Sequence, residues 1–108
     1  MKLIYLASAY SHPDKAVQEA RYDKVVEIAA RLKKEGHFIY SPIAHCHVMA
    51  TRHGLPTDWQ YWQHYLRVML PRCDEVWIAT EVDGWESSKG VTAEVELAKE
   101  FGIPVVYT

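Results

Sequence analysis

Short apolar segments alternate along this chain with longer segments of helical periodicity, and this alternation limits the possible folds more than any other feature. Between the first two apolar segments, apolar residues recur every three or four positions over residues 14–36, which predicts a long amphipathic helix. A strand, a crossover helix and a second strand favour parallel pairing. The four predicted strands are residues 2–7, 37–40, 75–79 and 104–107.

Two further helical segments complete the pattern. Asp58 is positioned to cap a helix that ends near Pro71, and a last helix runs from residue 90 or 91 to residue 101. Residues 43–57 contain breakers and small residues without a clear period, so we predict a long surface loop there. Helices on both faces of an open sheet give an α/β three-layer sandwich. Its sheet is expected to be parallel and flavodoxin- or Rossmann-like, with four to five strands.

The composition fits one globular domain over residues 1–108 and argues against several classes of protein. Charged residues make up 24% and hydrophobic residues 49% of the chain, which suits a packed core rather than disorder or a coiled coil. The 12 Lys and Arg and 14 Asp and Glu form no block of like charge, which disfavours nucleic acid or a membrane surface as the partner. Two cysteines form no multi-bridge framework and the N-terminal apolar run is too short to span a bilayer. We therefore expect a cytoplasmic protein that binds a small molecule.

The segments that follow the first three predicted strands are candidates for one shared binding pocket. Ligands of open parallel sheets bind beyond the carboxyl ends of the strands. Residues 8–12, 41–57 and 80–89 occupy that position in the sequence. We expect these three segments to meet at one edge of the sheet.

Glu94 is the most informative single residue. In the last predicted helix, Val91, Val95 and Ala98 form one apolar stripe, and Glu94 falls on the same inward arc. Burying a carboxylate is unfavourable unless it has partners or a task, so its position points to function. The alternative is that Glu94 lies at the wet edge of the arc or favours the helix N-terminal dipole.

The loop before that helix is suited to an anion. Residues 83–90 offer small residues, two hydroxyls and a lysine at a helix start, where unpaired backbone N–H groups attract a group such as phosphate. The simpler interpretation is that Ser87 or Ser88 only caps the helix. No GxGxxG or GxxxxGK[ST] motif supports a dinucleotide or P-loop site.

His45 and His47 are the only pair that suggests a metal site. A His-x-His pair can chelate when extended, but neither HExxH nor zinc-finger spacing accompanies it. Ordinary polar histidines are the commoner interpretation, so no metal or other cofactor is predicted. A metal-assisted hydrolase centred on this pair stays as a weaker alternative.

Four motifs in matching order carry a family resemblance over nearly the whole chain. They are residues 5–12 (YLASAYSH), 36–42 (GHFIYSP), 73–77 (CDEVW) and 84–94 (GWESSKGVTAE). Together they resemble the nucleoside 2-deoxyribosyltransferase superfamily, and more narrowly its small bacterial and phage branch with YSH and GWxxSxG signatures.

The resemblance implies chemistry at an N-glycosidic bond. In the superfamily a glutamate four residues after the loop glycine attacks the anomeric carbon of the sugar, and Glu94 matches that glutamate. A serine six residues earlier binds a 5′-phosphate in nucleotide-hydrolysing members, and Ser88 matches it. Residues 7–10 match the loop that lines the base and sugar site. The resemblance thus implies an N-ribosyl hydrolase or transferase acting on a nucleoside or nucleoside 5′-monophosphate.

The remaining candidate residues follow from these motifs and loops. Tyr10 and Trp85 are expected to wall the pocket, and His12, His45 or Asp58 to carry the proton to the base. Glu94, Tyr10 and Asp58 are the candidate catalytic residues. The candidate substrate-binding residues are Ala7, Ser8, His12, Ser41, His45, Asp74, Gly84, Trp85, Ser88 and Gly90.

One position departs from the superfamily pattern. Members usually carry an aspartate two turns before the Cys-Asp pair of the third strand, where it orients the nucleophile and protonates the leaving base, and the matching residue here is Leu66. Asp58 and His64 lie on the same predicted helix, but neither is at the expected step. A non-catalytic nucleotide-binding or sensing module is therefore the alternative function. Superfamily members commonly complete their sites across a subunit interface, so we expect a homodimer or homotetramer.

Overall fold

The sheet has four strands, all parallel, in the order β2-β1-β3-β4. It is seen in a computed structural model that describes residues 1–108. In the register of the sheet, Tyr5 lies opposite Tyr40 on one side and Val76 on the other. The predicted α/β sandwich with a parallel Rossmann-like sheet is confirmed. The strands are β1 (Leu3–Ala7), β2 (Phe38–Tyr40), β3 (Glu75–Ile78) and β4 (Val105–Tyr107).

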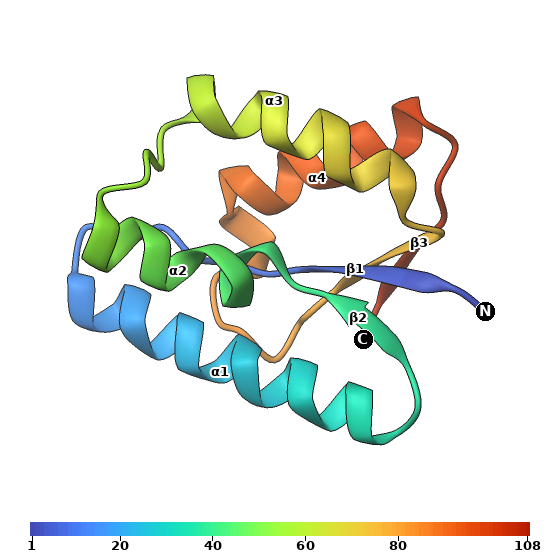
Figure 1. The fold of residues 1–108 in the computed structure, drawn as a ribbon, viewed down its shortest axis with the longest axis horizontal. Helices are drawn as coiled ribbons and strands as arrows, with labels where there is room; N and C mark the ends of the chain where they lie inside the picture. Colours follow the sequence, from blue (N-terminus) through green and yellow to red (C-terminus); the bar gives the residue numbers. More distant parts are fainter.

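Helices cover both faces of the sheet (Figure 1). One face packs against α1, and α3 and α4 lie together on the other. A shorter helix, α2, packs along α1 near the end of the sheet where β1 and β2 finish. The helices are α1 (Lys15–Lys34), α2 (Pro42–His53), α3 (Trp59–Met69) and α4 (Lys89–Glu100), with single 3-10 turns η1 (Leu70–Arg72) and η2 (Trp85–Ser87).

Strand alternation divides the hydrophobic core into two halves. Ile4 and Leu6 of β1 face α1, whereas Tyr5 and Ala7 face α3 and α4. All four side chains are buried, which is expected of a strand in the middle of a parallel sheet. The helix residues that complete the two halves are Val25, Ile28, Ala29 and Leu32 on α1, and Leu66, Val91, Leu97 and Ala98 on α3 and α4.

The prediction of a long loop after β2 is wrong, because residues 42–53 form α2. Ser41 caps this helix by accepting a hydrogen bond from the Ala44 N–H at 3.1 Å. Pro42 occupies the first turn, where its missing N–H leaves no bond unmade. Gly54 ends the helix with a φ of 70°, a conformation that glycine adopts without strain. The breakers that suggested a loop are the start and stop signals of a helix.

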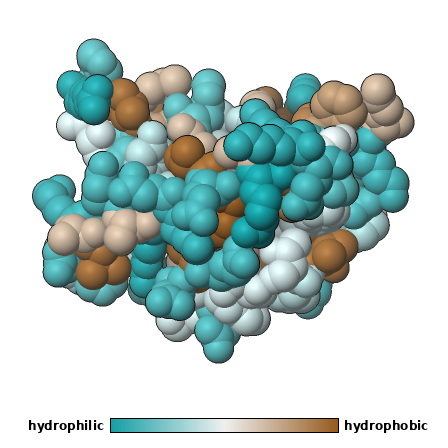
Figure 2. Space-filling view, turned by 90° about the horizontal axis from the view of Figure 1, so that it is seen from below, coloured by the Kyte–Doolittle hydropathy of each residue, from teal (hydrophilic) through white to brown (hydrophobic).

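The surface over α1 is mostly hydrophilic, with separate hydrophobic patches (Figure 2). No helix is both long enough and apolar enough to cross a bilayer. The two cysteines, Cys46 and Cys73, are buried and unpaired.

Candidate active site

A cavity of about 790 Å³ lies beyond the carboxyl ends of the strands. Its size suits a small organic ligand. Ser8 and Tyr10 line it from the segment after β1, and Gly84 and Ser88 from the segment after β3. One face of α2 supplies the wall after β2. The prediction that the three segments share one pocket is confirmed.

Two helices contribute whole faces to this pocket. On α2 the lining residues repeat at helical spacing and include one histidine in an otherwise apolar set: Pro42, Ile43, Cys46, His47 and Ala50. On α3 the lining face is largely aromatic and consists of Trp59, Trp62 and Leu66. The pocket therefore combines indole surfaces, which suit a flat ring, with a polar end formed by the loops.

Glu94 lies in the wall of the pocket and is almost fully buried, with 6% of its surface exposed. It projects from the second turn of α4 on the same side as Val91 and Ala98, which confirms the inward position predicted from periodicity. Burial raises the pKa of the Glu94 carboxyl to about 8, because the charged form loses solvation in this environment. A carboxyl held in a cleft with such a pKa is a candidate catalytic group.

Tyr5 is a buried polar neighbour of Glu94. Its hydroxyl is buried and forms no hydrogen bond of ordinary geometry. The same hydroxyl faces the Glu94 carboxyl. It lowers the pKa of Glu94 and so offsets part of the increase that burial causes. A small movement of either side chain would give the carboxylate a hydrogen-bond donor. Tyr5 was not among the residues predicted for the site, although a tyrosine in the middle of a buried strand is a signal that its hydroxyl has a partner.

The start of α4 forms the polar end of the pocket. Ser88 caps the helix by accepting a hydrogen bond from the Val91 N–H at 3.2 Å, so its own hydroxyl proton is free to reach a ligand. Lys89 and Gly90 line the pocket beside it. Across the opening, the hydroxyl of Ser8 is buried without a partner. These groups all donate hydrogen bonds, which suits an anionic ligand.

Arg21 of α1 adds a cation to this end. One guanidinium nitrogen donates to the carbonyl of Ser11 at 2.9 Å, while Nε is buried and has no partner. The side chain lines the pocket and passes beside Gly84. Arg21 was not among the predicted site residues, because nothing in the periodicity of α1 separates it from the other charged residues of that helix.

The guanidinium of Arg21 lies directly against Gly84. Its φ is 90°, and a Cβ at this position would lie 2.4 Å from a guanidinium nitrogen of Arg21. We expect Gly84→Ala to lower the free energy of unfolding by more than the ~1–2 kcal/mol of the backbone strain alone. Gly36→Ala is the matched control, because its φ is 99° and nothing lies within 4 Å of the added Cβ. Urea unfolding measures both variants, and equal losses would contradict the contact with Arg21.

A chain of hydrogen bonds leads out of the pocket from Tyr10. The Tyr10 hydroxyl lies 2.6 Å from Nδ1 of His47, and Nε2 of His47 lies 2.7 Å from a carboxylate oxygen of Glu19. Burial, followed by the charge of Glu19, raises the pKa of Tyr10 above its ordinary value. His47 was predicted to be an ordinary loop histidine, whereas it lies on the inward face of α2. Once α2 is recognised as a helix, this position follows from its spacing.

Several predicted binding residues line the pocket and others do not. Ser8, His12, Gly84, Ser88 and Gly90 are in its wall, as is Tyr10. The Nδ1 atom of His12 accepts a hydrogen bond from the Asp14 N–H at 2.9 Å. The predicted residues outside the wall are Ala7, Ser41, His45, Asp58, Asp74 and Trp85.

The residues outside the wall have structural positions instead. Ala7 is buried in the core, and Ser41 caps α2. Trp85 packs on the core and lies 5.6 Å from the ring of Tyr107. Asp74 accepts a hydrogen bond from the Leu3 N–H at 2.8 Å, where β1 begins, so it lies at the opposite end of the sheet. Asp74 directly precedes β3, and this loop passes the first residue of β1, so the Asp74 carboxylate holds the start of that strand.

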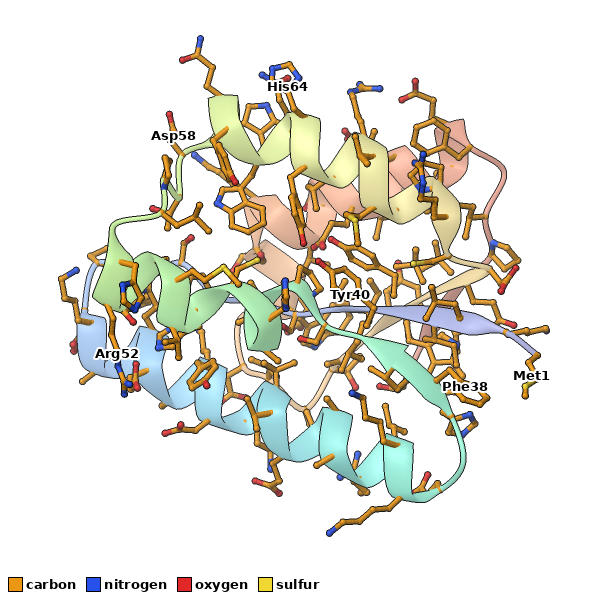
Figure 3. All side chains as sticks on the ribbon, in the orientation of Figure 1. Met1, Phe38, Tyr40, Arg52, Asp58 and His64 are labelled. Atoms are coloured by element: carbon orange, nitrogen blue, oxygen red, sulfur yellow. The ribbon has the colours of Figure 1, made fainter.

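Exposure separates the other candidates from the pocket. His45 is exposed on α2. Asp58 and His64 are also exposed and lie at the outer edge of the molecule (Figure 3). Asp58 occupies the N-cap position of α3 but makes no capping hydrogen bond. None of the three is placed to carry a proton to a group in the pocket.

The histidines do not form a metal centre. No group of three His, Cys, Asp or Glu side chains is arranged to hold a metal ion. His47 uses both ring nitrogens in hydrogen bonds within the protein, while His45 points to solvent.

Comparison with known proteins identifies a family. No curated protein matches the sequence. A family profile described as a domain of unknown function, DUF1937, matches residues 2–108. Since this match covers nearly the whole chain and includes every residue of the pocket, the chain belongs to the DUF1937 family.

Proposed function

We propose that this protein is an N-glycosidase that acts on a nucleoside 5′-monophosphate, with Glu94 as the nucleophile. The observation that carries the proposal is a buried carboxyl in the wall of a pocket that is also lined by hydrogen-bond donors at the start of the same helix. The motifs that resemble the nucleoside 2-deoxyribosyltransferase superfamily support the same chemistry, because its nucleophile matches Glu94.

The reaction needs a carboxylate that can form and release a bond to the sugar. An oxygen of Glu94 bonds to the anomeric carbon while the carbon–nitrogen bond breaks, and the electron pair of that bond leaves with the base, which takes up a proton. Water, or a second base, then attacks the anomeric carbon and frees the carboxylate. Burial favours this role because a poorly solvated carboxylate is a stronger nucleophile than one in bulk water.

The polar end of the pocket supports a phosphate on the substrate. Ser88 and the free N–H groups of the first turn of α4 donate to an anion, and Arg21 and Lys89 add positive charge. Trp59 and Trp62 offer aromatic surfaces to the base. A nucleotide has an anion at one end and a flat ring at the other, so its shape and charge match this distribution.

The direct test is release of free base from a panel of ribo- and deoxyribonucleosides and their 5′-monophosphates, followed by chromatography. We expect at least one 5′-monophosphate to be cleaved, with kcat/KM at least about tenfold above that of its nucleoside. Absence of release from every compound, at a pH between 6 and 9, would remove the proposal.

Arg21→Gln tests the phosphate site. We expect KM for the 5′-monophosphate to rise by about 10- to 100-fold, since a charge-assisted hydrogen bond contributes ~1.5–3 kcal/mol. The nucleoside, which lacks the phosphate, should show little change. Arg52→Gln is the control, because Arg52 is exposed at the end of α2 and does not line the pocket. Equal effects of Arg21→Gln on nucleotide and nucleoside would contradict a phosphate contact.

Leu66 favours a second candidate function, a nucleotide sensor that does not turn over its ligand. Leu66 is buried in the core and lines the pocket, so the superfamily's usual acid is replaced by an apolar side chain. Thermal shift separates the two functions. Saturable stabilisation by a nucleotide with no base released over hours favours the sensor, whereas turnover favours the glycosidase.

We also propose that the protein assembles as a homodimer or homotetramer. Large hydrophobic side chains are exposed at both edges of the sheet and on α3, and these are unfavourable in water unless covered. Light scattering should give a mass of two or four chains, and a monomer mass at micromolar concentration would contradict the proposal. The exposed residues are Phe38, Trp59, Tyr61, Val68, Val106 and Tyr107.

A further inference from the structure

Tyr10, His47 and Glu19 form a continuous hydrogen-bonded chain from the pocket to solvent. Tyr10 lines the pocket, and its hydroxyl is 2.6 Å from Nδ1 of His47. His47 is buried, with 4% of its surface exposed, and Nε2 is 2.7 Å from Glu19. The Glu19 side chain is 57% exposed. A buried imidazole thus bridges a phenol in the pocket and a carboxylate in bulk water.

The imidazole is held in one orientation by its neighbours. Tyr22 stacks on the His47 ring with 3.8 Å between centroids and 18° between planes. Tyr22 and Glu19 are three residues apart on α1, so one face of that helix supplies both the stacking ring and the carboxylate. Ring rotation would break both short hydrogen bonds and the stack. Such a fixed arrangement of two nitrogen atoms is what transfer of a proton through imidazole requires.

We propose that Tyr10 is the proton donor to the leaving base, and that His47, held in place by Glu19, is the positioning residue that gives Tyr10 a replacement proton. This inference rests on the proposed N-glycosidase function. It provides a proton donor in place of the aspartate that superfamily members usually carry at the position of Leu66. The donor reaches the pocket from the loop after β1 rather than from α3.

Protons balance through both halves of the reaction. With protons on both nitrogens of His47, Nε2 donates to Glu19, Nδ1 donates to the Tyr10 oxygen, and the hydroxyl proton of Tyr10 is free for the substrate. As the carbon–nitrogen bond breaks, the Tyr10 proton moves to the base nitrogen and the Nδ1 proton moves to the Tyr10 oxygen. His47 is then a neutral imidazole. When water attacks the sugar, its proton returns through Tyr10 to Nδ1, which restores the starting state.

The environment keeps the Tyr10 hydroxyl protonated until the base leaves. Burial and the nearby Glu19 carboxylate both raise the pKa of Tyr10, so the phenol stays protonated at neutral pH.

Two substrates that differ in their need for a proton give the test. A nucleoside 5′-monophosphate releases a base that must be protonated, whereas a 4-nitrophenyl ribofuranoside 5-phosphate releases a phenolate that is stable without a proton. For Tyr10→Phe we expect kcat on the nucleotide to fall by about 10²- to 10³-fold and kcat on the nitrophenyl compound by less than about tenfold. Glu94→Gln should abolish cleavage of both compounds.

His47→Gln tests the positioning residue separately. Glutamine can keep a hydrogen bond to Tyr10, but its amide cannot give a proton to Tyr10 and take it back. We expect the same selective loss in kcat as for Tyr10→Phe, with KM changed by less than about threefold. His53→Gln is the control, since His53 is exposed in the last turn of α2 and lies outside the pocket.

The outcomes separate this inference from the function on which it rests. Cleavage of neither compound by the wild type contradicts the N-glycosidase itself. Equal losses on both compounds in Tyr10→Phe, or full activity of His47→Gln on the nucleotide, contradict the proton relay while leaving Glu94 as the nucleophile. Selective loss on the nucleotide in both variants supports the relay.

Discussion

Glu94→Gln is expected to lower release of base from the preferred nucleotide by about 10³-fold or more. The amide keeps the size and most of the polarity of the side chain, but it cannot form the bond to the anomeric carbon. Chromatographic assay of free base under single-turnover and steady-state conditions measures the loss. Binding of the nucleotide, followed by calorimetry, should survive, because the phosphate and ring contacts remain.

Glu96→Gln is the matched control, since Glu96 lies two residues further along α4 and is exposed. It should retain wild-type kcat and KM. In the wild type, kcat/KM should rise as the pH approaches about 8, because the nucleophile must be ionised and burial raises the pKa of Glu94 to about 8. Activity in Glu94→Gln within tenfold of the wild type would contradict a nucleophilic role.

The same buried carboxyl should make the protein less stable as the pH rises. At pH 4 Glu94 is protonated in both the folded and unfolded states and has no differential effect. Between pH 4.5 and pH 8 it ionises in the unfolded chain but keeps its proton in the folded protein, whose Glu94 pKa is about 8. The unfolded state then binds fewer protons, so the free energy of unfolding falls over this window and levels off above it.

Glu94→Gln removes this dependence. The free energy of unfolding of the variant minus that of the wild type should increase by roughly 3–5 kcal/mol from pH 4 to pH 9. Urea denaturation at a series of pH values measures the free energy of unfolding of both proteins. Because only the change of their difference with pH is compared, any constant effect of the amide on packing drops out. A difference that stays constant across this range would mean that Glu94 is well solvated or already paired as a carboxylate.

Much of the site could be predicted from the sequence, because topology and helical spacing determine it. Parallel strands place the segments after β1, β2 and β3 at one edge of the sheet, so a shared pocket followed from the alternation of strands and helices. The spacing of Val91, Glu94 and Ala98 placed the carboxyl on the inner side of α4. These predictions needed only the regular geometry of the elements.

The rest depends on tertiary contacts that no local pattern encodes. In α2, His47 interrupts the apolar face, so residues 43–50 lacked a clear hydrophobic period and the helix was missed. Arg21 lines the pocket with its guanidinium against Gly84, and these two residues are far apart in the sequence. Asp74 belongs to a matching motif, yet its hydrogen bond to Leu3 places it at the far end of the sheet.

The central claim is that Glu94 attacks a sugar carbon, and trapping the covalent intermediate tests it most directly. A 2′-deoxy-2′-fluoro analogue of the preferred nucleotide slows both steps by destabilising positive charge on the sugar, and it lets the glycosyl ester accumulate. Mass spectrometry of the intact and digested protein should show one sugar phosphate attached to the peptide that contains Glu94, with none on Glu94→Gln. A label on another residue, or turnover of the natural nucleotide without any label on the wild type, would contradict the account.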